Sequence, residues 1–134
     1  MISNKVITVF LIIAGLIGLS VGVGLAFFPD ATHAQYGIFI SGNVSQLSET
    51  RATGMSISII SIIILIGAFM VRLRYTALVL STVVFLSYGI GRLFSLAIDG
   101  IPSQGLLVAM VIELLIGVIA FLVLRGLKSL IPIK

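Results

Sequence analysis

Long apolar runs separated by short polar breaks dominate the chain. A helix needs about 20 predominantly apolar residues to cross the hydrocarbon core of a bilayer, and each run is about that long. The pattern predicts an all-α integral membrane four-helix bundle that forms a single domain over residues 1–134, with one longer outer loop at residues 29–48. The predicted helices cover approximately residues 5–28, 49–71, 75–98 and 104–127.

The breaks between the runs carry capping and turn chemistry. Proline disfavours helix in the residue before it, so the first run is expected to end at Phe28-Pro29-Asp30. Ser48 is placed to cap the second helix, and Glu49 complements the positive end of that helix. Arg72-Leu73-Arg74 and Asp99-Gly100-Ile101-Pro102 leave only tight connections on either side of the third helix.

The first apolar run has a second interpretation, as a secretory signal peptide. Lys5 supplies a short positive segment, and Thr32-His33-Ala34 loosely resembles a small-residue cleavage site. The run is nevertheless longer than the usual apolar region of about 7–15 residues in such peptides. We therefore expect a retained membrane helix.

Composition agrees with a membrane protein and excludes several kinds of chemistry. The chain is 60% hydrophobic and 9% charged, with a mean hydropathy of +1.34. It has no cysteine, which excludes a disulfide, a thiolate metal site and a cysteine nucleophile. The single histidine, His33, has no second nitrogen ligand for zinc, and no cofactor motif is visible. We expect no metal and no cofactor.

The net charge of +4 does not indicate a nucleic-acid-binding surface, because the basic residues flank the apolar runs and indicate membrane topology. Six of the eight lie on one side of a four-span arrangement, and the acidic residues fall toward the other side. Basic loops favour the cytoplasm, so both termini are predicted to be cytoplasmic. The six are Lys5, Arg72, Arg74, Arg125, Lys128 and Lys134.

Arg92 and Glu113 interrupt the third and fourth apolar runs. Arg92 precedes Asp99 by seven residues, or about 10 Å of helix, and Glu113 follows Gln104 by nine residues, or about 13 Å. A tight turn joins the two helices, so the charges can meet at similar depth. A charge at the bilayer centre costs about 2.5–3.5 kcal/mol on insertion scales, which favours burial toward a partner. An ion pair between Arg92 and Glu113 is therefore predicted.

Helical spacing gathers further polar residues around this pair. Ser81, Tyr88, Arg92, Ser95 and Asp99 share one face of the third helix. Residues at the start of the second helix could close the centre from the outer side. The pair serves either as a structural staple that fixes helix register or as a ligand or proton site. The candidate polar centre comprises Arg92, Glu113, Asp99, Glu49, Arg51, Tyr88 and Ser95.

Small residues form faces on the helices and permit close helix approach in membranes. We interpret them as packing surfaces. They are Gly15, Gly18 and Gly22 in the first helix, Gly54, Ser58 and Ser61 in the second, and Ala109, Gly117 and Ala120 on the face of Glu113.

Several motifs together resemble the domain of unknown function 4345 family, a group of small, mostly bacterial integral membrane proteins with four predicted helices. The motifs are Glu49-x-Arg51-Ala52-x-Gly54, Gly91-Arg92-x-x-Ser95, Asp99-Gly100-x-Pro102-Ser103 and Glu113-Leu114. The resemblance covers nearly the full chain, although Met55 stands where a second adjacent glycine is expected. It implies this fold, a shared polar centre and a multi-pass location in the bacterial cytoplasmic (inner) membrane, but no established activity. More remotely, the arrangement is similar to DoxX-like membrane proteins, some of which accompany redox enzymes.

Three functions fit this sequence. We expect a non-catalytic accessory or assembly subunit of a larger membrane complex, or a homo-oligomer, because no soluble domain or catalytic dyad is visible. The alternative is a protein that binds or modifies a lipid or another hydrophobic small molecule, with Arg92 holding the head group and Glu113 orienting Arg92 or acting as acid or base. A small oligomeric transporter is the third. The bilayer is the expected partner in each case, and nucleic acid is not.

Overall fold

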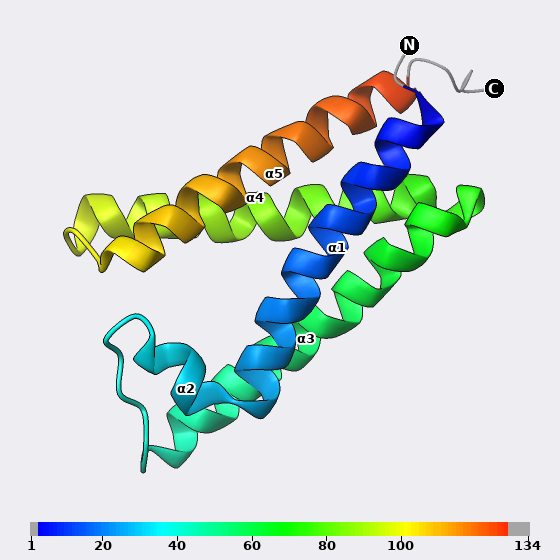
Figure 1. Cartoon of the computed structure of the whole chain (residues 1–134). Helices are drawn as coiled ribbons and strands as arrows, with labels where there is room; N and C mark the ends of the chain where they lie inside the picture. Colours follow the sequence, from blue (N-terminus) through cyan, green and yellow to red (C-terminus); the bar gives the residue numbers. More distant parts are fainter. Residues whose placement is uncertain (1–2, 129–134) are drawn as a thin grey trace.

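The computed structural model describes residues 3–128 and is built from helices (Figure 1). Residues 1–2 and 129–134, among them Lys134, lie outside the described part. Four of the helices are long and apolar enough to cross a membrane, and no strand occurs among residues 3–128. The predicted all-α membrane fold is confirmed. The elements are α1 (Asn4–Phe27), α2 (Pro29–Ala34), α3 (Val44–Phe69), the 3-10 turn η1 (Val71–Leu73), α4 (Arg74–Ile98) and α5 (Gln104–Lys128).

The start of α3 differs from the prediction. The helix begins at Val44 rather than near residue 49, and Asn43 caps it by accepting a hydrogen bond from the N–H of Gln46 at 3.1 Å. Asparagine is among the strongest N-cap residues. The predicted cap at Ser48 is wrong, because Ser48 lies inside the helix.

The predicted outer loop contains a short helix. α2 begins directly at Pro29, a residue that suits the first position of a helix because it needs no N–H donor there. Asp30 lies in the first turn of α2, where its charge complements the helix dipole. The loop that follows turns through Gly37 and Gly42, whose φ angles of 75° and 83° favour glycine.

α1 and α3 pack closely along their small-residue faces. Gly18, Gly22, Gly54 and Ser58 are all buried. A Cβ atom built on Gly22 would lie 2.7 Å from the backbone nitrogen of Ser58 and 2.9 Å from the carbonyl oxygen of Gly54. Any larger side chain would force the helices apart, so these faces are packing surfaces, as interpreted from the sequence.

One end of the molecule is closed by polar contacts over an apolar core. Arg74 donates to Asn4 Oδ1 at 3.0 Å and to Thr8 Oγ1 at 2.9 Å, and Thr8 donates to the carbonyl oxygen of Ala68 at 3.3 Å. These contacts join the starts of α1 and α4 to the end of α3. The core nearby includes Ile7, Leu11, Ala14, Ile64, Ala68, Ala77, Leu78 and Val123.

The helices form two antiparallel pairs, α1 with α3 and α4 with α5. The pairs lie together at the end where α1 begins and α5 ends, and they diverge toward the opposite end (Figure 1). The diverging end also carries α2 and the loop after it, and we refer to it as the outer end, after the predicted orientation. The fold is therefore tightly packed at one end and splayed at the other.

The close packing of α1 against α3 can be tested by a substitution that adds a single methyl group. Gly54→Ala is expected to lower the free energy of unfolding by about 1–3 kcal/mol, because overpacked sites must shift backbone or side chains. The new Cβ would lie 2.7 Å from the carbonyl oxygen of Gly22 and 2.8 Å from the carbonyl carbon of Leu25. Unfolding of the purified protein in mild detergent by added SDS, followed by circular dichroism, measures the change.

Gly91→Ala is the matched control, since a Cβ on Gly91 meets no heavy atom within 4 Å. Alanine is a better helix former than glycine by about 1 kcal/mol, so this control should be neutral or stabilising. Equal destabilisation by the two substitutions would contradict the packing account.

Candidate functional site

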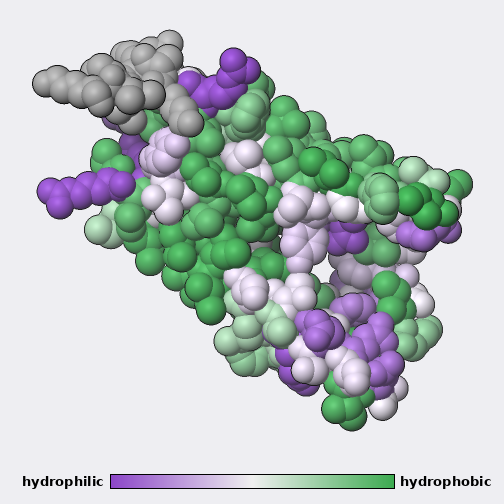
Figure 2. All heavy atoms as spheres, turned by 180° about the vertical axis from the view of Figure 1, so that it is seen from behind, coloured by the Kyte–Doolittle hydropathy of each residue, from purple (hydrophilic) through white to green (hydrophobic). Residues whose placement is uncertain are grey.

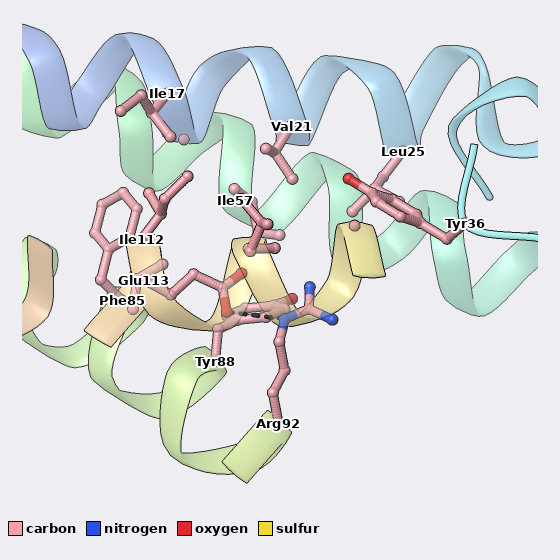
Figure 3. Close-up of a pocket in the computed structure, with 15 residues that line it drawn as sticks. Ile17, Val21, Leu25, Tyr36, Ile57, Phe85, Tyr88, Arg92, Ile112 and Glu113 are labelled. Carbon is pink, nitrogen blue, oxygen red and sulfur yellow. Dashed lines mark hydrogen bonds and ion pairs between the residues drawn. The ribbon is translucent and has the colours of Figure 1, made fainter. Parts of the chain in front are cut away.

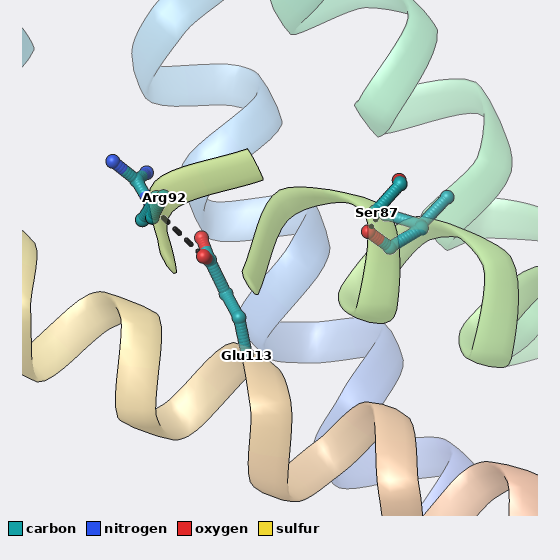
Figure 4. Close-up of polar contacts among 4 residues, drawn as sticks. Ser87, Arg92 and Glu113 are labelled. Carbon is teal, nitrogen blue, oxygen red and sulfur yellow. Dashed lines mark hydrogen bonds and ion pairs between the residues drawn. The ribbon is translucent and has the colours of Figure 1, made fainter. Parts of the chain in front are cut away.

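Arg92 on α4 and Glu113 on α5 form a salt bridge. Arg92 Nε donates to Glu113 Oε2 at 2.8 Å (Figure 4). The side chains are 29% and 16% exposed, respectively. It is the one ion pair found within residues 3–128. The pairing inferred from helix depth is present, while its use as a functional site stays a prediction.

Two glycine contacts next to the salt bridge, both on the side toward the packed end of the molecule, bring the helices together. A Cβ on Gly89 would lie 2.7 Å from Leu114 Cδ2, and a Cβ on Gly117 would lie 2.8 Å from the backbone nitrogen of Leu86. Gly89 precedes Arg92 by about one turn, and Gly117 follows Glu113 by about one turn. The close approach of α4 and α5 therefore sets the distance between the helices that the side chains of Arg92 and Glu113 must span.

The salt bridge uses only part of the guanidinium group. Guanidinium has five N–H donors, and Glu113 takes the one on Nε. The two terminal nitrogens of Arg92 have no hydrogen-bond partner in the described part of the chain. Figure 3 shows them turned away from the Glu113 carboxylate, toward the side of the cleft where Leu25 and Tyr36 lie.

Arg92 borders a cleft with two adjoining chambers. The apolar chamber has a volume of about 260 Å³ and lies between the two helix pairs (Figure 3). Its lining is Ile17, Gly18, Val21, Leu25, Tyr36, Ile57, Val84, Phe85, Tyr88, Arg92, Gly105, Val108, Ala109, Ile112 and Glu113.

The polar chamber has a volume of about 300 Å³ and lies toward the loop after α2. Leu25, Tyr36, Tyr88 and Arg92 line both chambers, so the two form one cleft. In Figure 2 a hollow opens at one end of the molecule, and hydrophilic atoms border it. The polar chamber is lined by Leu25, Thr32, His33, Tyr36, Ile38, Glu49, Thr50, Thr53, Tyr88, Arg92 and Leu106.

The outer loop forms one wall of the cleft. Tyr36 reaches across to the start of α5, where a Cβ on Gly105 would lie 2.9 Å from two carbons of the Tyr36 ring. His33 lines the polar chamber and its Nδ1 lies 3.0 Å from the carbonyl oxygen of Pro29. Sequence reasoning missed Tyr36 and considered His33 as a lone histidine that cannot form a zinc site. No sequence signal singled out Tyr36, because the same loop also contains Ile38, Phe39 and Ile40.

The structure brings together some of the predicted site residues and separates others. Arg92, Glu113 and Tyr88 meet in the apolar chamber, and Glu49 lines the polar chamber with Arg92 and Tyr88. No hydrogen bond of the Tyr88 hydroxyl is found among residues 3–128. Tyr88 is therefore a cleft residue rather than a partner of the ion pair.

The other three predicted residues line neither chamber and have hydrogen-bond partners elsewhere. Ser95 donates to Asp99 Oδ2 at 2.8 Å, and both residues are exposed. Asp99 lines neither chamber. Arg51 does not close the cleft from the outer side, because its Nη1 donates to the carbonyl oxygen of Ala26 at 2.6 Å and so holds the end of α1.

Within residues 3–128 no group of three or more histidine, aspartate or glutamate side chains is placed to hold a metal ion. The chemistry visible in the cleft is therefore that of one shared guanidinium, two carboxylates, one imidazole, hydroxyl groups and a large apolar surface.

Comparison with known protein families identifies the family of this chain. The model of the domain of unknown function family DUF4345 matches residues 6–124. The chain belongs to this family, as the motifs indicated. No curated protein and no solved structure matches it.

The salt bridge predicts a strong coupling between its two members. Arg92→Leu and Glu113→Leu should each lower the free energy of unfolding, because each leaves an unpaired charge at membrane depth. Partial exposure keeps each loss below the about 3–5 kcal/mol found for fully buried pairs. The double variant should recover much of the loss. A double-mutant cycle in SDS unfolding measures the coupling, and additive losses would mean that the two charges do not depend on each other.

Proposed function

We propose that this membrane protein binds an amphipathic, lipid-like molecule in the cleft, with the head group at Arg92 and the hydrocarbon part in the apolar chamber. The observation that supports it most is the pair of terminal guanidinium nitrogens that face the cleft without a protein partner. The multi-pass location in the bacterial cytoplasmic membrane, with both termini inside, is part of this proposal and rests on charge pattern and family resemblance.

The shape and polarity of the cleft support a small molecule. Binding sites for small molecules typically have about 300–1,000 Å³ and are mainly apolar with a few placed polar groups. The two chambers, of about 260 and 300 Å³, together fall in that range. The lining changes from aliphatic residues such as Val21 and Ile112 to threonines and charged residues near the outer loop. An amphiphile has the same gradient along its length.

The unpaired guanidinium nitrogens support a head group that carries oxygen acceptors. Arginine presents its donors in a planar fork that matches carboxylate and phosphate oxygens. Glu113 holds Nε and so orients the fork, which reduces the rotamer freedom that binding must remove. Glu113 is assigned a positioning role for this reason.

The structure of the other end weighs against transport by a single chain. Below the cleft, Leu11 and Leu78 are fully buried in an apolar core that joins α1, α3 and α4. A polar path across the membrane would have to cross this core. The accessory-subunit role and an oligomeric transporter stay predictions from sequence, and the binding proposal is compatible with the former.

Filling the apolar chamber tests the proposal. Ala109→Trp puts an indole into the chamber and should reduce the lipid retained by the purified protein at least about tenfold, which corresponds to a loss of about 1.4 kcal/mol in binding. Native mass spectrometry of protein released from detergent gives the number of lipids per chain.

Val118→Trp is the matched control, because Val118 lies on the same helix, is 47% exposed and lines neither chamber. It should retain lipid as the unmodified protein does. Undiminished lipid in Ala109→Trp would show that the bound molecule lies elsewhere.

A further inference from the structure

The polar chamber contains a carboxylate as well as the guanidinium group. Glu49, on the second turn of α3, lines this chamber with Arg92. Glu49 takes part in no ion pair within residues 3–128. The charge of Arg92 is already balanced by Glu113, so Glu49 leaves the three side chains with a net formal charge of −1.

This charge balance bears on which head group fits. A head group that is only anionic would place its charge in the same chamber as Glu49, and like charges repel. A head group with both a phosphate and a cation would satisfy Arg92 and Glu49 together. The charges of the cleft are thus complementary to a zwitterion rather than to a simple anion.

We propose that the ligand is a membrane phospholipid whose head group carries a phosphate and a primary ammonium, as in phosphatidylethanolamine; this rests on the proposed function. The phosphate accepts hydrogen bonds from the two terminal nitrogens of Arg92. The ammonium donates to the carboxylate of Glu49. An acyl chain passes Leu25 and Tyr88, which border both chambers, into the apolar chamber.

The polar lining favours a primary ammonium over a quaternary one. A primary ammonium has three N–H donors, whereas a quaternary ammonium has none. The chamber offers oxygen acceptors on Glu49, Thr50 and Thr53. Hydrogen bonds to a carboxylate are charge-assisted and stronger than those between neutral groups, so loss of the N–H donors weakens binding.

The full chain, reconstituted into nanodiscs, provides the test. The nanodiscs contain equal amounts of phosphatidylethanolamine, phosphatidylcholine and phosphatidylglycerol with identical acyl chains. After extraction into detergent, native mass spectrometry gives both the number and the identity of the lipids retained. The unmodified protein should retain phosphatidylethanolamine about tenfold over each of the other two, which corresponds to about 1.4 kcal/mol for each comparison.

Variants identify the residue responsible. Glu49→Gln should retain less phosphatidylethanolamine and so lose the preference over phosphatidylglycerol. Glu49 is exposed on the helix surface, so this change does not disturb packing. Asp99→Asn is the matched control, because it removes a carboxylate at the same end of the molecule that lines neither chamber. It should keep the preference.

The outcomes separate this inference from the proposed function. Lipid retained by the unmodified protein without preference, or a preference that persists in Glu49→Gln, would overturn the head-group inference and leave lipid binding intact. A preference for phosphatidylcholine would also overturn it. No retained lipid in the unmodified protein would overturn both.

Discussion

An ionised side chain within the hydrocarbon region needs a partner, and the α4–α5 hairpin provides one for Arg92 in Glu113. The tight connection between the helices sets the two residues at the same depth, and the contacts of Gly89 and Gly117 set the distance between the helices. The resulting bond occupies only Nε, so the guanidinium is held in place while its terminal nitrogens remain available. The same side chain thus takes part in the helix contact and in the proposed binding site.

The two ends of the molecule have different physical roles. At one end, Arg74 joins the starts of α1 and α4 over an apolar core, and along α1 and α3 the glycine faces bring the backbones into contact. At the other end the helix pairs diverge and leave a cleft bordered by the outer loop through Tyr36. This arrangement suits a binding site, because Arg92, Glu113 and Glu49 stand on helices, which position side chains more precisely than loops do.

The helices and the ion pair could be predicted because both depend on local periodicity and on depth along a helix. The cap at Asn43 was missed because Ser48 lies closer to the apolar run and also suits an N-cap. Arg51 was assigned to the polar centre from its position alone, yet its partner is the carbonyl oxygen of Ala26, a buried residue near the end of α1. The cleft itself could not be predicted, since the divergence of the helix pairs depends on contacts between segments far apart in sequence. Ser95 and Asp99, one turn apart on α4, form a hydrogen bond with each other. Ser95 still borders an open groove with Tyr88 and Arg92, whereas Asp99 lines no chamber with them.

The central claim is that the space beside Arg92 holds a lipid rather than protein. A density map of the full-length protein in native-lipid nanodiscs tests it most directly. The account predicts an elongated density in the apolar chamber that continues to the terminal nitrogens of Arg92, with the Arg92–Glu113 bond intact. Helix pairs closed against each other with no intervening density, or a cleft filled by a protein chain, would contradict it.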